Sequence, residues 1–240
     1  MVLKDHTYIL PRTREKSIFE LVTFFYIFFD FYILYIPLDL SNFSVILELV
    51  SKGRLEAFSD AVIAIIMTIM VLELHIPEGA DFAALQTLTP VFLSYVLSFV
   101  FLGIYWNNHH HLWQAAKQVN GPVLWANLHL LFWLSLVPFV TGWMGENGLA
   151  ELPVALYGVV LWMSGLAYYI LTQTLVRLHG TDSITATALG RRVKEISSLV
   201  AYGVAIVFAF VNAGISLALY VLVAIIWLIP DTRIEKTLGQ

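Results

Sequence analysis

The chain has 240 residues, of which 59% are hydrophobic and 12% are charged, with a mean hydropathy of +0.80 and a formal net charge of −4. Average globular proteins are roughly 45–50% apolar and about 25% charged, so this composition predicts a polytopic membrane protein and excludes a disordered chain and most soluble enzymes. There is no broad basic segment to hold nucleic acid, and the lack of cysteine excludes disulfides, thiolate catalysis and cysteine metal sites.

Residues 1–50 are predicted to be an N-terminal extension of unclear role. The stretch 18–36 is apolar and aromatic but contains Glu20 and Asp30. If this stretch spanned the membrane, the basic residues before it would lie on the opposite side from Lys52, against the preference of Lys and Arg near short loops for the cytoplasm. We therefore favour an interfacial segment over a seventh span. A signal peptide fits less well, because no small-residue cleavage site follows.

Residues 51–240 are predicted to form one all-α transmembrane domain. A helix needs about 20 mostly apolar residues to cross a bilayer. Segments of this kind are separated by turns rich in Gly, Pro and Asn. Six segments qualify: 54–74, 89–109, 120–143, 152–175, 193–211 and 213–229.

The distribution of charge predicts how these six helices are oriented. If the helices zigzag, every Lys and Arg from Lys52 onward falls on the same side, while the opposite loops carry only acidic residues. Because basic residues near short loops favour the cytoplasm, both ends of the six-helix domain are expected there. We expect the protein in the cell membrane of a prokaryote, in contact with the lipid bilayer.

Polar residues gather at the predicted cytoplasmic ends of the first two helices. Asp60 lies about 9 Å of helical rise past Arg54, and a carboxylate at that depth is costly enough to indicate a function. The second helix runs antiparallel and ends in a Trp-Asn-Asn-His-His-His sequence at the same level. We predict a structural or gating network formed by Arg54, Phe58, Ser59, Asp60, Trp106, Asn107, His109 and His110.

Three other interpretations of these polar residues have weaker support. Successive helical residues are about 100° apart, so the three adjacent histidines cannot converge on one metal ion, and we predict no metal site. A membrane enzyme is disfavoured, because the spans hold no second carboxylate or histidine motif. The main alternative is a proton-coupled secondary transporter using Asp60, His110 and His129, although no inverted repeat or pair of broken helices is visible.

One apolar stripe on the first helix has two interpretations. Ile65, Thr68, Ile69 and Leu72 lie within about 100° of one another on a 3.6-residue period. The residues alone favour a stripe that packs on neighbouring helices. The sharper interpretation is an apolar constriction that lines a central pore.

A family resemblance changes that preference. The string Arg54-x-x-x-Phe58-Ser59-Asp60, with Tyr-Trp-x-x-His-His at the end of the second helix, resembles bacterial members of the transmembrane protein 175 family, relatives of the endosomal and lysosomal potassium channel. The resemblance covers residues 53–236. It implies a homotetramer of six-helix subunits, with the first helix of each lining a pore on the four-fold axis.

The same resemblance implies a potassium-selective channel that lacks a carbonyl selectivity filter. No Thr-Val-Gly-Tyr-Gly loop occurs in the chain. By offset from Asp60, the family's constriction residues fall on Ile65, Thr68 and Leu72, which already share the apolar stripe. The pore therefore becomes the favoured interpretation, with potassium as the permeating ion and no cofactor.

Overall fold

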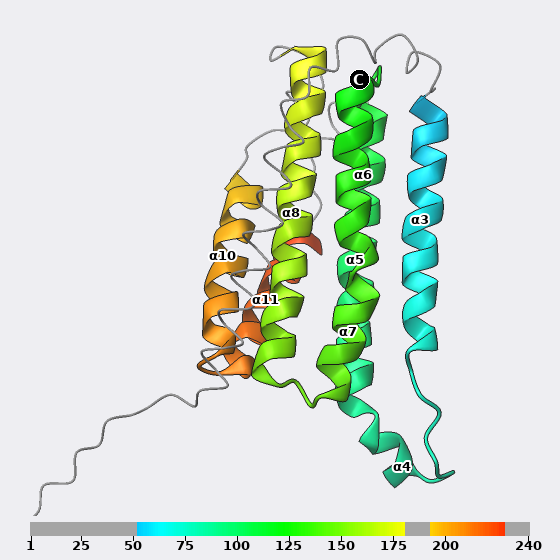
Figure 1. Ribbon diagram of the computed structural model, residues 1–240, viewed down its shortest axis with the longest axis vertical. Helices are drawn as coiled ribbons and strands as arrows, with labels where there is room; N and C mark the ends of the chain where they lie inside the picture. Colours follow the sequence, from blue (N-terminus) through cyan, green and yellow to red (C-terminus); the bar gives the residue numbers. More distant parts are fainter. Residues whose placement is uncertain (1–51, 181–192, 229–240) are drawn as a thin grey trace, which may run out of the picture. The chain divides into compact units, whose positions relative to one another are not determined.

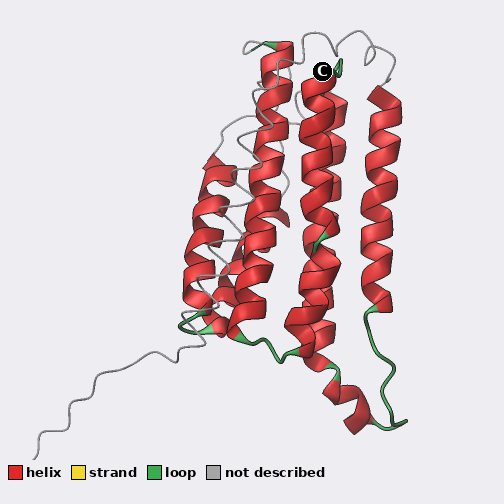
Figure 2. Cartoon of the chain, viewed as in Figure 1, coloured by secondary structure: helices red, strands yellow, loops and turns green. Residues whose placement is uncertain are grey.

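The computed structural model describes residues 52–180 and 193–228, and the predicted extension lies outside them. The described residues are helical, with no strand among them (Figure 2). Their helices are α3 (Lys52–Leu72), α4 (Phe82–Thr87), α5 (Thr89–Ala115), α6 (Gly121–Ser135), α7 (Val137–Glu146), α8 (Glu151–His179), α10 (Val193–Ala209) and α11 (Ala213–Leu228). The all-α prediction is confirmed for this part of the chain.

Among the described residues, four helical stretches are long and apolar enough to cross a membrane. These are α3, α5, the combined α6 and α7, and α8, with 21, 27, 26 and 29 residues. They correspond to the first four predicted spans. The fifth and sixth predicted spans correspond to α10 and α11, which have 17 and 16 residues. The chain is thus a multi-pass membrane protein, while the count of six spans stays a prediction.

The helices differ in detail from the predicted segments. The third predicted span is divided at Leu136, where Pro138 occupies the first turn of α7 and supplies no backbone N–H. The short α4 was not predicted; its N-cap Asp81 accepts a 2.8 Å hydrogen bond from the backbone N–H of Ala84. Helix α5 continues to Ala115, past its predicted end at 109.

The bundle is arranged around α8, which contacts α6, α7, α10 and α11, while α3 contacts α5, α6 and α7 (Figure 1). Buried hydroxyl groups connect the helices. Ser98 on α5 bonds to Thr141 on α7 at 2.7 Å and to the Tyr157 hydroxyl on α8 at 3.0 Å. Hydrogen bonds of this kind hold membrane helices together, because lipid is as apolar as their side chains.

Close packing between α8 and α11 depends on one glycine. Gly158 faces the ring of Tyr220, and a Cβ atom at that position would overlap the tyrosine hydroxyl. The hydroxyl instead donates to the carbonyl of Val154 at 3.1 Å. The missing side chain therefore lets a large buried ring reach the backbone of α8.

Candidate functional site

Helix α3 has one face packed inside the chain and one face turned away from it. The packed face is centred on Ser59 and faces α5, α6 and α7. Its buried residues recur every three or four positions: Leu55, Ser59, Ile63, Ile66 and Met70. The centre of the predicted pore stripe lies about 130° around the helix from Ser59.

The predicted pore residues all lie on the exposed side of α3. Ile65 is 56% exposed and Leu72 is 80% exposed, although both are fully apolar. Thr68 and Ile69 lie between them on the same side and are also exposed. A largely apolar face of α3 therefore points away from the other described helices.

Thr68 places one polar atom within this apolar stripe. Its hydroxyl donates within the helix, with the carbonyl oxygens of Ala64 and Ile65 both at 3.0 Å. A hydroxyl has one proton and two acceptor lone pairs, so the oxygen keeps its acceptor capacity while its proton is engaged. The exposed face of α3 therefore offers an oxygen that suits a cation, bounded along the helix by apolar residues.

A chain of buried polar side chains connects α3 to two neighbouring helices. Asn127 on α6 donates from Nδ2 to the Ser59 Oγ at 2.8 Å, and Ser59 donates to the carbonyl of Leu55, also at 2.8 Å. The other end of the Asn127 amide, Oδ1, lies 2.8 Å from the His109 Nε2 on α5. Trp113, one turn further along α5, directs its indole N–H at the His109 ring. We call Ser59, Asn127, His109 and Trp113 the polar chain.

The polar chain defines the tautomer of His109. Because Asn127 uses its NH₂ group on Ser59, its carbonyl oxygen accepts, and the His109 Nε2 must carry a proton and donate. The indole N–H of Trp113 lies 2.9 Å from Nε2 and 3.1 Å from Nδ1, and with the proton on Nε2 only Nδ1 can accept it. His109, Asn127 and Ser59 are fully buried. The arrangement satisfies groups that lipid would leave without partners.

The other predicted network residues lie outside the polar chain. Asp60 is half-buried, and its Oδ1 atom is buried with no hydrogen-bond partner among the described residues. His110 stacks on the exposed ring of Trp106, with ring centroids 6.3 Å apart, and its Nδ1 lies 3.5 Å from the Glu56 carboxylate. Asn107 is exposed on α5, about two turns before the helix ends at Ala115. The structure therefore places the network's hydrogen bonds at Ser59 and not at Asp60.

Arg54 and Phe58 lie on a different face of α3 from Ser59. Both are exposed, and their positions lie about 20° from Ile65 around the helix axis. They therefore continue the pore stripe toward the start of α3. The predicted network therefore combined Ser59, on the packed face of α3, with Arg54 and Phe58, on its exposed face.

Sequence reasoning missed the central member of the polar chain. Asn127 lies seven residues into the third predicted span, and an amide among so many apolar residues was the available signal. It also missed Glu56 as the carboxylate beside His110. No group of three or more His, Asp or Glu residues in the described ranges is arranged to hold a metal ion.

Comparisons with known proteins relate this chain to a family of channels. Residues 54–138 match the family model described as "Endosomal/lysosomal potassium channel TMEM175". The chain is 54% identical over 190 residues to a potassium channel of Chryseobacterium sp. strain P1-3, covering 79% of this chain and 99% of that protein. It is 30% identical over 185 residues to a potassium channel of Streptomyces collinus, covering 72% and 90%.

The fold is similar to that of a solved channel. The crystal structure of a lysosomal potassium-selective channel TMEM175 homologue from Chamaesiphon minutus matches with a TM-score of 0.64 and 25% sequence identity. The match covers 74% of this chain and 96% of that one. The region matched by the family model contains both the pore stripe of α3 and all four residues of the polar chain.

Proposed function

This chain belongs to the TMEM175 family, and we propose that it is a potassium-selective channel whose pore is lined by the exposed face of α3. The family assignment confirms the resemblance drawn from the sequence. As a member of this family, the protein is a membrane-embedded cation channel and not an enzyme. The potassium selectivity, the constriction and the assembly are the proposed parts.

One observation carries the proposal for the pore. Ile65, Thr68 and Leu72 lie on the exposed side of α3, away from the face that packs on the other described helices, and they share one stripe along it. In a homotetramer, four copies of this stripe would face a common axis. Rings of Ile65 and Leu72 would narrow the path, with a ring of Thr68 hydroxyl oxygens between them.

Ion selectivity in such a pore would follow from hydration. An ion crossing an apolar ring must shed or rearrange its water, and potassium loses less than sodium because it is more weakly hydrated. The Thr68 oxygens would replace part of the lost shell, since their protons already bond to the helix. We expect modest selectivity, because no cage of backbone carbonyls compensates the ion.

The assembly and orientation complete the proposal. Four chains of 27.1 kDa would give a complex of about 108 kDa, apart from detergent and lipid. Both ends of the six-helix domain would face the cytoplasm of a prokaryotic cell, since every Lys and Arg from Lys52 onward falls on that side. The acidic loops would face outward, where their charge attracts cations to the pore mouth.

The pore is tested by bi-ionic reversal potentials of purified channels. Ile65→Asn and Leu72→Asn each place an amide in the constriction, and we expect a lower potassium-to-sodium permeability ratio and altered conductance. The matched controls are Ile225→Asn and Leu222→Asn on α11, which carry the same substitutions at apolar positions that are each 51% exposed. If all four variants behave like the wild type, the assignment of the pore to α3 is wrong.

The alternative, a proton-coupled transporter, is separated by the same recordings. A carrier moves ions far more slowly than a pore and gives no unitary current steps. Single-channel steps that persist when the pH gradient is abolished would support the channel. Flux that requires a proton gradient would support the transporter instead.

A further inference from the structure

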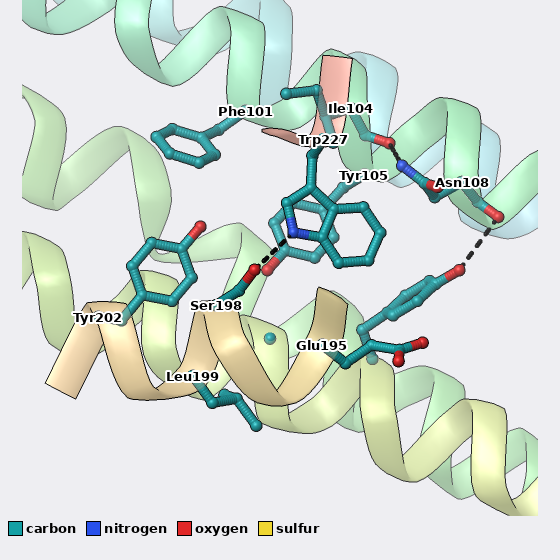
Figure 3. Close-up of a pocket in the computed structure, with 11 residues that line it drawn as sticks. Phe101, Ile104, Tyr105, Asn108, Glu195, Ser198, Leu199, Tyr202 and Trp227 are labelled. Carbon is teal, nitrogen blue, oxygen red and sulfur yellow. Dashed lines mark hydrogen bonds between the residues drawn. The ribbon is translucent and has the colours of Figure 1, made fainter. Parts of the chain in front are cut away.

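A second candidate site lies on the far side of the bundle from α3. A pocket opens between α5, α8, α10 and α11 (Figure 3). Five aromatic rings and one carboxylate dominate its lining: Phe101, Tyr105, Tyr168, Tyr202, Trp227 and Glu195. None of these residues belongs to the pore stripe or to the polar chain.

The rings form two groups around the pocket. Tyr168 is 6.3 Å from both Tyr105 and Trp227 between ring centroids, with edge-on geometry in both pairs. Phe101 and Tyr202 form a second pair, also 6.3 Å apart. Aromatic faces carry partial negative charge and attract cations within about 6 Å, and several rings around one space are typical of sites for organic ammonium groups.

The polar atoms of two rings are already engaged with the protein. The indole N–H of Trp227 donates to the Ser198 Oγ at 2.8 Å, and the Tyr168 hydroxyl donates to the carbonyl of Asn108 at 3.3 Å (Figure 3). These bonds hold the rings in place. They also leave the indole donor occupied, so that Trp227 does not present an N–H group to an anion.

The charge of the lining favours a cation over an anion. Glu195, in the first turn of α10, is the one acidic side chain among the described lining residues, which include no Lys or Arg. A carboxylate at the edge of an aromatic group complements a positively charged ligand.

The size of the pocket limits the ligand to a small head group. The pocket, together with the open solvent at its mouth, has a volume of about 450 Å³. The part that the centre of a water molecule can occupy is much smaller, about 30 Å³. If compact, that inner space holds a sphere of roughly 3.3 Å radius once the probe's own radius of about 1.4 Å is included. A methylated ammonium group fits such a space, whereas a drug-sized ligand does not.

One glycine helps to keep this space open. A Cβ atom on Gly165 would lie 3.3 Å from the Leu199 Cδ2, 3.8 Å from the Tyr105 hydroxyl oxygen and 3.9 Å from the Tyr202 Cε2. A larger side chain at this position would project among the residues that line the pocket. By contrast, nothing lies within 4 Å of a Cβ atom on Gly103 of α5.

We propose that this pocket binds a small organic ammonium group, held by the aromatic rings and the Glu195 carboxylate. The group is either that of a soluble amine or the head group of a choline or ethanolamine lipid. The pocket shares no residue with the proposed pore. A test of the pocket therefore does not depend on the ion selectivity of the channel.

The test is titration calorimetry of the full chain in nanodiscs of pure phosphatidylglycerol. The probes are choline and its uncharged isostere 3,3-dimethylbutan-1-ol. We expect choline to bind and the isostere to bind at least tenfold more weakly. Equal binding of the two would overturn the proposal, because it would show an apolar pocket that does not recognise charge. Absence of choline binding would overturn it as well.

Variants locate the binding. Glu195→Gln and Trp227→Leu are each expected to weaken choline binding at least tenfold, and Gly165→Val to abolish it by filling the pocket. Gly103→Val is the matched control and should bind choline like the wild type. Quaternary ammonium ions can also enter cation pores, so Ile65→Asn is measured in parallel. If only Ile65→Asn changes choline binding, the site is the pore and the proposal is wrong.

Folding and ligand source are checked in the same preparations. Gly165→Val must elute at the wild-type mass, and if it does not, Glu195→Gln, which keeps the shape of the side chain, decides. Adding phosphatidylcholine to the nanodiscs distinguishes the two sources. Competition with choline would identify a lipid head group, whereas unchanged choline affinity would identify a soluble amine.

Discussion

Replacing Asn127 by leucine tests whether the polar chain holds α3 in place. Asn127 is fully buried on α6 and contributes one hydrogen bond to Ser59 on α3 and one to His109 on α5. Leucine has a similar volume and suits the surrounding lipid-like interior, so the substitution removes these two bonds without leaving a large cavity. Ser59 keeps its bond to the Leu55 carbonyl, whereas the Nε2 proton of His109 is left buried without an acceptor.

The expected loss of stability follows from these two contacts. Hydrogen bonds between membrane helices contribute about 0.6 kcal/mol on average and up to about 1.7 kcal/mol each. A buried donor left without a partner costs about 1–3 kcal/mol in its own right. We therefore expect Asn127→Leu to lower the free energy of unfolding by about 1–3 kcal/mol. Part of that loss should be coupled to Ser59, because the two side chains share one bond.

The assay is unfolding of the purified channel in a detergent titration, together with single-channel recording. Asn107→Leu is the matched control, because Asn107 is exposed on α5 and its replacement should leave stability unchanged. A double-mutant cycle with Ser59→Ala should give a coupling of about 0.6–1.7 kcal/mol. If Asn127→Leu matches Asn107→Leu in stability and open probability, the polar chain does not hold α3.

Three further predictions concern packing, topology and assembly. Gly158→Ala should destabilise the protein by about 1–3 kcal/mol, because its Cβ would displace the Tyr220 ring, whereas Gly203→Ala, with open space around its Cβ, should leave unfolding in detergent unchanged or slightly harder. Because the chain has no cysteine, an impermeant maleimide applied outside intact cells should label Glu78→Cys and not Lys117→Cys; the reverse pattern would invert the proposed orientation. Light scattering of the detergent complex should give a protein mass of about 108 kDa, and a mass near 27.1 kDa would remove the central pore.

The helices were predictable because their signal is local. A run of apolar residues long enough to cross a bilayer is visible in any window of the sequence, and the predicted start and end of α3 lie within two residues of those found. The break at Leu136 was not predicted, because apolar residues continue through it and a proline inside a membrane helix does not always end it. Helix α4 is a single short segment that hydropathy does not detect.

The candidate site was predicted only in part, because its key contacts join distant residues. Ser59 and Asn127 are 68 positions apart, and no local pattern indicates which polar residue of one span meets which of another. The antiparallel course of the first two predicted helices suggested the residues near 106–110 as partners of Asp60. The structure instead uses Asn127, since the packed face of α3 is centred on Ser59, whereas Asp60 lies about 100° further around the helix.

The two faces of α3 are linked by the geometry of the helix. Both faces are apolar, so hydrophobic packing alone would hold α3 almost equally well after a rotation about its axis. A hydrogen bond is directional, and the bond from Asn127 to Ser59 selects one rotation. Since Ile65 lies about 120° around the helix from Ser59, that selection also determines where the pore stripe points. The buried amide on α6 thus determines the direction of the exposed face of α3. If that face lines the pore as proposed, a change at Asn127 would alter the ion path without contacting it.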